Sequence, residues 1–447
     1  MDADGQLLTA HDKGLPARAI GMTASDFLAT RPRLDEFWTP LIVLDDAAMR
    51  SNVATMAAWC AERGLEIMPH GKTTMAPDLW KRQTDAGALG ITLATMGQVR
   101  TGRDLGLDSI MLANAAVDAR SLAWLAGQLA APAFRFVCWA DSLATVDAME
   151  RGLRAVGVPR PVDVCVELGA VGGRTGARSL REAVAIAERL ASSEVLRLAG
   201  VAGYEGSLGH DRSPAALAAV RMYLEAQLEL HAAIGHLYDD GERYVTAGGS
   251  AYFDVVAEVW AQAPRDDRTH FTLRSGAYIV HDDGFYRGIS PFDEGRSSSE
   301  RSDLRSSGER SDPRSLSERS ETKRPVPDTD SPRFVNAMHG IVRVVSSPEP
   351  GLALVDGGKR DLPYDEGLPI PRAAADDLAG PWHPLDATVS AMNDQHSYVR
   401  PAAPLPIGSV VRLGLSHPCT AFDKWRVLPV VESVESDVVT GLVRTYF

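Results

Sequence analysis

Several features of secreted, membrane-bound and nucleic-acid-binding proteins are missing from this sequence. Its 447 residues include only four cysteines, without the spacing of a disulfide framework, which predicts a reducing compartment and a cytoplasmic location. No run approaches the roughly 18 apolar residues of a membrane span. The N-terminus has no basic region followed by an apolar one, so we expect no signal peptide. The formal net charge of -13 argues against a nucleic-acid or membrane-surface partner, because both favour basic faces.

Short β-rich runs alternate with amphipathic helical stretches from residue 41 to about 290. A first run at 41–44 is followed by eight more, at 65–69, 90–94, 109–113, 134–138, 162–167, 197–201, 243–247 and 271–275. Helical patterns separate most of them, most clearly at 179–191 and 213–234. The alternation predicts an α/β fold, and eight repeats favour a closed (β/α)8 barrel of the TIM type; a doubly wound open sheet is the alternative. With 65–69 as the first barrel strand, 41–44 lies outside the ring.

The pattern divides the chain into four segments. They are an N-terminal segment at 1–40, the barrel at 41–290, a low-complexity insert at 296–333 and a β-domain at 334–447. Within the insert, 297–325 contains three imperfect copies of a polar nine-residue unit, which predicts disorder. A docking or phosphorylation segment is the functional alternative. Short β-branched runs separated by Gly and Pro predict the β-domain.

Two polar segments follow predicted barrel strands, at the end where such barrels carry their active sites. Lys72, in MPHGKTTMAP, follows the first strand directly. A lysine in a partly desolvated site supplies the amine for Schiff-base chemistry, although a lysine at a strand end is more often a solvated charge. His70, two residues earlier, would share its side of an extended segment. The segment TAGGS after the seventh strand would present backbone N–H groups of Gly248, Gly249 and Ser250 to a phosphate, or form an ordinary turn.

Two further clusters lie in the predicted β-domain. His417 and Cys419, in SHPCTAFDKW, would share one face if they lie on a strand, and imidazole and thiolate are natural zinc ligands. The spacing also arises by chance. His396 ends the segment NDQH, which is either a second polar site or a turn with ordinary capping.

In order and spacing, these segments resemble the D-serine dehydratase and D-threonine aldolase family. Its members are pyridoxal-phosphate enzymes of fold type III, with an alanine-racemase-like barrel. The resemblance runs from residue 39 to the C-terminus, excluding the insert, and is nearest to a bacterial branch labelled amino acid deaminase. It rests on the motifs PHGKTTMAP, GITLATMGQ, VELGAVGGRTG, GYEG, TAGGS, RSGAYIVHD, NDQH and SHPCTAFDKW.

The resemblance implies a role for each candidate residue. Lys72 matches the Schiff-base lysine, the turn at 248–250 matches the phosphate site, and His417 and Cys419 match a metal pair that holds zinc, with manganese or cobalt as alternatives. Arg174 and Tyr204 match positions that line the cofactor, and Tyr278 matches a tyrosine at the barrel end near the site. His70, beside the lysine, is a further candidate for cofactor binding. His396 is the candidate for the acid that protonates the leaving group if a metal does not assist its departure. Fold type III also implies a homodimer in which the β-domain of one subunit helps to close the barrel mouth of the other.

The activity implied is removal of water from a D-3-hydroxy amino acid resembling D-serine, which gives a 2-oxo acid and ammonia. Dehydratases of the family tend to carry H-x-C and aldolases H-x-D, so Cys419 favours elimination over retro-aldol cleavage. NDQH departs from branches with an acidic residue before the histidine, which leaves the substrate open. The alternatives are a D-threonine-aldolase-type lyase and, from another class, a non-catalytic pyridoxal-phosphate-binding protein.

Overall fold

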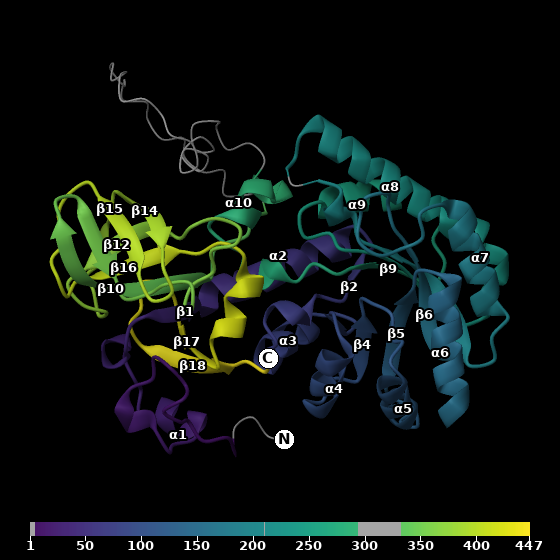
Figure 1. Ribbon diagram of the computed structural model, residues 1–447, viewed down its shortest axis with the longest axis horizontal. Helices are drawn as coiled ribbons and strands as arrows, with labels where there is room; N and C mark the ends of the chain where they lie inside the picture. The colour runs from purple at the N-terminus through teal and green to yellow at the C-terminus, as the bar shows by residue number, and fades with distance from the viewer. Residues whose placement is uncertain (1–4, 210, 294–331) are drawn as a thin grey trace.

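Eight parallel strands form one of two sheets in the computed structural model, which describes residues 5–209, 211–293 and 332–447 (Figure 1). Their order is β2-β9-β8-β7-β6-β5-β4-β3. A parallel bridge between His70 and Thr92, and a 2.9 Å hydrogen bond from the N–H of Leu89 to the carbonyl of Ile67, join the two ends of the sheet. The barrel is therefore closed, as predicted, and the open sheet is not what forms. The strands are β2 (Glu66–Ile67), β3 (Ile91–Leu93), β4 (Ser109–Leu112), β5 (Arg135–Ala140), β6 (Val162–Leu168), β7 (Leu196–Gly203), β8 (Arg243–Ala247) and β9 (Thr269–Leu273).

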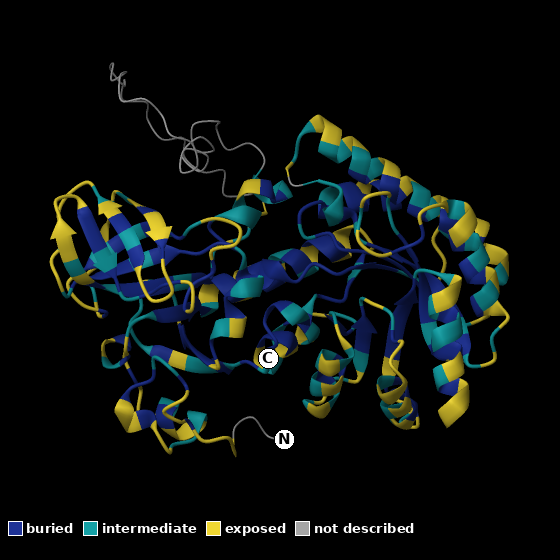
Figure 2. Cartoon of the chain, in the orientation of Figure 1, coloured by how far each residue is buried: buried dark blue, intermediate teal, exposed yellow. Residues whose placement is uncertain are grey.

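Each barrel strand is followed by a helix, and all eight predicted strand positions are confirmed. Short polar side chains begin most of these helices: Thr95, Ser142 and Ser179, for example, each accept a hydrogen bond from a backbone N–H in the first turn. The helices bury one face against the strands and expose the other (Figure 2). They are α3 (Pro77–Asp85), α4 (Met96–Asp104), α5 (Ala119–Gln128), α6 (Leu143–Val156), α7 (Leu180–Ala191), α8 (Pro214–Ala233), α9 (Phe253–Trp260) and α10 (Phe285–Ile289).

The second sheet is mainly antiparallel and lies beside the barrel. Its main path runs β13-β12-β16-β10-β1-β17-β18, and β11, β14 and β15 extend it. Besides β1 (Leu41–Asp45), its strands are β10 (Met338–Glu349), β11 (Leu352–Val355), β12 (Ile370–Ala375), β13 (His383–Pro384), β14 (Ala387–Met392), β15 (Ser397–Pro401), β16 (Val410–Gly414), β17 (Val427–Val431) and β18 (Val439–Arg444).

Strand β1 belongs to this second sheet and not to the barrel. It pairs antiparallel with β10 and parallel with β17, and all five of its residues are buried. The predicted boundary of the barrel segment, 41–290, therefore begins one strand too early. The expectation that 41–44 lies outside the ring of barrel strands agrees with the structure. The physical reason is that eight strands already close the barrel, so a buried ninth strand must satisfy its backbone elsewhere. Helix α2 (Asp46–Glu62) leads from β1 to the barrel.

The N-terminal segment packs beneath the second sheet, with α1 (Ala24–Ala29) and short 3-10 turns at Ala17–Ala19 and Leu34–Glu36. One of its links to this sheet is a backbone bridge between Arg33 and Val438. Residues 296–331 of the predicted insert at 296–333, including the segment 297–325 that is predicted to be disordered, lie outside the described part of the chain. No helix in the described ranges is both long and apolar enough to cross a membrane.

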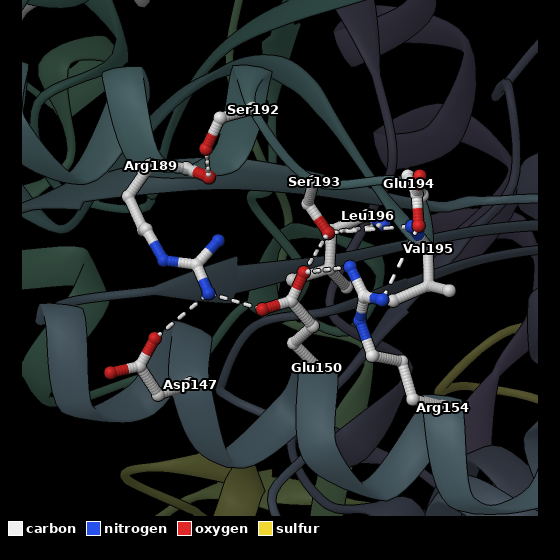
Figure 3. Close-up of polar contacts among 9 residues, drawn as sticks. All are labelled: Asp147, Glu150, Arg154, Arg189, Ser192, Ser193, Glu194, Val195 and Leu196. Atoms are coloured by element: carbon white, nitrogen blue, oxygen red, sulfur yellow. Dashed lines mark hydrogen bonds and ion pairs between the residues drawn. The ribbon is translucent and has the colours of Figure 1, made fainter.

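An ion-pair network joins α6 to the turn before β7 (Figure 3). The Glu150 carboxylate, 9% exposed, accepts hydrogen bonds from Arg189, from Arg154 at 3.1 Å and from the Ser193 hydroxyl at 2.8 Å. The Ser193 oxygen in turn accepts the N–H of Leu196, the first residue of β7. The Arg189 hydrogen bond, helped by Ser193 and Arg154, lowers the pKa of Glu150 from 4.5 to about 2.

Replacing Glu150 by glutamine should lower the free energy of unfolding by about 1–2 kcal/mol at neutral pH, because three donors lose their charged acceptor. A lowered folded-state pKa stabilises the fold above the unfolded value of 4.5, and this contribution disappears as pH falls toward about 2. Denaturant unfolding at pH 7 and pH 3 should therefore show the two proteins converging at the lower pH. Asp147→Asn, which removes a half-exposed partner of Arg189, is the matched control and should lower the free energy of unfolding by less than Glu150→Gln does. An equal difference in stability between wild type and Glu150→Gln at both pH values would contradict the lowered pKa of Glu150.

Candidate active site

Lys72 stands at the barrel mouth, in the 3-10 turn Gly71–Thr73 directly after β2. The N–H of His70 donates to the carbonyl of Arg274 at 3.1 Å, and the Trp80 indole donates to the carbonyl of Gly71 at 3.1 Å. A Cβ on Gly71 would lie 2.4 Å from Ile91 and 2.6 Å from the Trp80 indole nitrogen. The glycine before the lysine is therefore a packing requirement, and it holds the turn against the barrel.

Burial lowers the pKa of the Lys72 ammonium. The nearby guanidinium groups of Arg174 and Arg274 lower it further, and Cys419 acts in the opposite direction. A lowered pKa leaves more of the amine neutral, which is the form that attacks a carbonyl carbon. The electrostatics thus support the predicted chemical role of this lysine.

His70 lies beside the lysine and is held neutral. Burial lowers the pKa of its imidazole well below 6.5, and the positive charges of Lys72, Arg274 and Arg174 add to the effect. Its Nδ1 is buried and has no hydrogen-bond partner among the residues that the structure describes. A buried nitrogen without a partner beside a lysine fits a bound polar group.

Arg274 is a site residue that the sequence analysis missed. It is 1% exposed, donates to the Thr246 hydroxyl at 2.6 Å and to the Gly203 carbonyl at 2.5 Å, and lies 4.6 Å over the Trp139 ring. The quoted motif RSGAYIVHD begins at this arginine, but only the closed barrel shows that its side chain turns inward.

A cavity of about 420 Å³ lies between the barrel mouth and the second sheet. Arg174 and Tyr204 both line it, with the guanidinium 4.3 Å from the centre of the Tyr204 ring. The second sheet contributes His417 and Glu366, and α10 contributes an aromatic wall. The wall residues are Phe285 and Tyr286.

In the turn after β8, the two glycine N–H groups that were expected to bind a phosphate donate to a protein carboxylate instead. The N–H of Gly248 donates to Glu205 Oε2 at 2.8 Å, and the N–H of Gly249 donates to Glu205 Oε1 at 2.5 Å. Gly249 has a φ of 74°, which an L side chain rarely adopts. Ser250 and Ala251, the next two residues, line the cavity.

Tyr278 lies apart from this cavity. Its ring packs 6.0 Å from that of Phe334, and burial raises the pKa of its hydroxyl against the effect of a hydrogen bond with Gln83. It lines a separate small pocket that shares Ser250 and Tyr286 with the cavity. A contact between Tyr278 and the cofactor stays a prediction.

His417 and Cys419 lie together, but not on a strand. Strand β16 ends at Gly414, His417 has a left-handed φ of 54°, and Cys419 sits in the 3-10 turn Pro418–Thr420. The strand-face argument for this pair was therefore wrong: Pro418 cannot donate a ladder hydrogen bond, so the strand stops before it. The pair shares a side because of the tight turn, and the two side chains are hydrogen-bonded to each other.

This pair meets the turn that carries the lysine. Cys419 Sγ lies 3.2 Å from the Thr73 hydroxyl, next to Lys72. The buried Asp282 carboxylate accepts the N–H of His417 at 2.9 Å, which ties this loop to the chain that follows β9. Two segments about 345 residues apart thus form one site.

The donor set fits a metal with open coordination positions. His417 Nδ1 lies 2.6 Å from Asp365 Oδ2, so Nε2 remains for a metal, as in carboxylate–histidine–metal arrangements. Within the described ranges, no group of three or more His, Cys, Asp or Glu side chains is arranged to hold a metal. A metal here would have two protein ligands, and water or substrate would supply the rest.

His396 does not join this group within one chain. It is exposed and lies in the turn between β14 and β15, where its carbonyl accepts the N–H of Asn393 at 2.8 Å. The remaining groups fit pyridoxal phosphate: a lysine with a lowered pKa beside a neutral histidine, the buried Arg274, and the cavity, which Arg174 and the end of the glycine turn line.

Comparison with known proteins finds similar sequences and similar folds. Residues 337–431 match the family model described as a putative serine dehydratase domain. A D-threonine aldolase from Arthrobacter sp. is 25% identical over 406 residues, which is 90% of this chain and 91% of the relative.

Solved structures share the fold over almost the whole chain. A D-threonine aldolase from Filomicrobium marinum superposes with a TM-score of 0.71 at 22% identity, covering 93% of this chain and 97% of the other. A D-threo-3-hydroxyaspartate dehydratase has a TM-score of 0.67 at 20% identity, covering 93% and 99%. That structure is a cysteine-to-alanine variant in a metal-free form.

The contacts of His417 with Cys419 and Asp365 predict that its ring titrates at alkaline pH in the metal-free protein. The hydrogen bond with Cys419, followed by that with Asp365, raises the pKa of His417 from 6.5 to about 9. Any stability that these contacts confer together is complete below pH 6.5 and disappears as pH rises through about 9. Asp365→Asn should move the titration of the His417 ring, followed by NMR, back toward 6.5. Glu366→Gln, one residue on, is the control, and an unmoved titration in Asp365→Asn would contradict the coupling.

Proposed function

The chain belongs to the D-serine dehydratase and D-threonine aldolase family of pyridoxal-phosphate enzymes, and from this membership we propose that it is a lyase that removes water from a D-3-hydroxy amino acid resembling D-serine. The products would be a 2-oxo acid and ammonia. The observation that carries the proposal is the meeting of Lys72 with the His417–Cys419 pair, through the 3.2 Å contact between Thr73 and Cys419.

Lys72 has two tasks in this proposal. Its Nζ would hold the cofactor covalently and, after the substrate amine takes its place, would accept the Cα proton. The lowered pKa of the ammonium supports both tasks, because each needs the neutral amine. Bound pyridoxal phosphate supplies an electron sink for the charge that develops at Cα. Arg174 and Arg274 keep this region positive, which suits anionic ligands.

His417 and Cys419 would hold a zinc ion, with manganese or cobalt as alternatives. Bound zinc supplies a Lewis acid for a poor leaving group such as hydroxide. Asp365 would keep the His417 ring oriented for ligation. The metal-free form named for the dehydratase relative supports metal use in the family.

A retro-aldol cleavage is the nearest rival, since matched relatives include a D-threonine aldolase and a 3-hydroxy-D-aspartate aldolase. Cys419 supports elimination, because the resemblance associates cysteine at this position with dehydratases. A non-catalytic cofactor-binding protein is disfavoured by the position of His417 and Cys419, which such a protein would not need beside Lys72.

We also propose a cytoplasmic homodimer. The support for a dimer is the family resemblance, in which the β-domain of one subunit helps to close the barrel mouth of the other. A role for His396 as an acid in the reaction requires that second subunit, because in one chain the residue lies on the outer hairpin.

The reaction class is tested by offering purified protein D-serine, D-threonine and D-threo-3-hydroxyaspartate and assaying 2-oxo acid, ammonia and glycine. We expect 2-oxo acid and ammonia in equal amounts from at least one substrate, because elimination releases both. Lys72→Ala should abolish turnover and the visible absorbance of bound cofactor together. Glycine with an aldehyde as the main products would support the aldolase instead.

The metal is tested by separating two steps of one turnover. Chelation, or Cys419→Ala, should suppress 2-oxo acid formation while sparing cofactor absorbance and some exchange of the Cα proton with deuterium. The reason is that proton removal depends on Lys72, whereas hydroxide departure depends on the metal pair. Zinc should restore the chelated wild type but not Cys419→Ala. Elimination at the full rate after exhaustive chelation would remove the metal from the mechanism.

A further inference from the structure

Glu205 is a buried carboxylate at the cavity that has no role in the chemistry proposed above. It follows β7 in the 3-10 turn Glu205–Ser207, is 1% exposed and still lines the cavity. A buried carboxylate is costly unless hydrogen bonds or opposite charge compensate it. Here the N–H groups of Gly248 and Gly249 donate to its two oxygens, one each. The Arg274 guanidinium adds a favourable Coulomb interaction.

The same glycines are packed on their other sides. A Cβ on Gly248 would lie 2.6 Å from the Tyr204 ring, and a Cβ on Gly249 would lie 2.9 Å from Leu273. The Ser275 hydroxyl lies 3.3 Å from the Gly248 carbonyl and donates to it. Neighbouring side chains and the carboxylate thus hold the turn, so its shape depends on Glu205.

We propose that Glu205 is a positioning residue for the cofactor phosphate: it binds the two glycine N–H groups, and so sets the turn in the shape that presents Ser250 and Ala251 to the cavity. The inference rests on the proposed use of pyridoxal phosphate. A phosphate that took the same two N–H groups would have to displace a carboxylate of like charge. Ser250 and Ala251, which already line the cavity, are the residues of this turn left to meet it.

The test compares pyridoxal phosphate with pyridoxal, which has the same aldehyde and lacks the phosphate. Cofactor-free wild type and Glu205→Gln are titrated with each, and absorbance of the lysine adduct gives two dissociation constants. The dissociation constant of pyridoxal divided by that of pyridoxal phosphate measures how much the phosphate contributes to binding. In Glu205→Gln this ratio should fall by about tenfold, because the amide accepts only one of the two N–H groups and turns its NH2 toward the other. Binding of pyridoxal should change by less than about twofold.

Glu167→Gln is the matched control. Glu167 is also buried, at the end of the neighbouring strand β6, and accepts a hydrogen bond from the Thr175 hydroxyl at 2.7 Å. It should leave the ratio unchanged. Glu205→Asp keeps the charge but shortens its reach, so it should also lower the ratio, and it serves as the test if Glu205→Gln does not fold.

Three results would overturn the inference. An unchanged ratio would mean that Glu205 does not act through the phosphate, and a parallel loss for both aldehydes would mean general damage. Tighter binding of pyridoxal phosphate in Glu205→Gln would mean that the carboxylate competes with the phosphate for the glycine N–H groups. Each of these leaves the lyase proposal standing, whereas a wild type that binds neither aldehyde overturns both.

Discussion

The junction between the barrel mouth and the second sheet is the constraint on which the site depends. Asp282 comes from the chain after β9 and accepts the N–H of His417 at 2.9 Å, while Thr73 lies 3.2 Å from Cys419. The carboxylate of Asp282 is buried and also accepts N–H groups at the start of α10, so one side chain orders two segments at the cavity wall. If this junction shifted, the lysine and the imidazole–thiol pair would no longer face the same space. Strand β1 also connects the two parts, because it pairs within the second sheet and the chain continues from it through α2 into the barrel.

Charge is arranged around that space in two layers. Burial is the main cause that lowers the pKa of Lys72 and keeps His70 neutral, and the positive charges of Arg174 and Arg274 add to it at the barrel mouth. Behind them, buried carboxylates compensate the arginines. Burial lowers the pKa of Arg274, and neighbours that include Glu205 and Glu167 oppose this effect. The pKa therefore falls only to about 10, so the guanidinium stays charged at neutral pH and can support both the turn and an anionic ligand. A positive mouth attracts anions and favours a neutral amine, so the same charges suit both roles proposed for this site.

The positions of the barrel strands could be predicted from local pattern alone. Each strand is a short apolar run with a helix after it, and parallel strands covered by helices need no long-range information to be recognised. For the same reason Lys72 and the turn at 248–250 could be assigned to the mouth: both follow strands in a barrel whose strand ends all point one way. The site residues without such a pattern were missed. Glu205 stands in the quoted motif GYEG and Arg274 in RSGAYIVHD, yet their partners are backbone groups of other strands.

The sequence by itself determined the barrel, its eight strands, the lysine at the first strand end and the pair at 417 and 419, because each is local in the chain. Tertiary structure alone decided which sheet takes β1, since that depends on which neighbours can satisfy its backbone. It also decided that His417 and Cys419 share a tight turn and not a strand, that Asp365 holds the imidazole, and that Tyr278 packs against Phe334. These outcomes depend on contacts between segments tens to hundreds of residues apart, and no local pattern of apolar and polar residues carries that information.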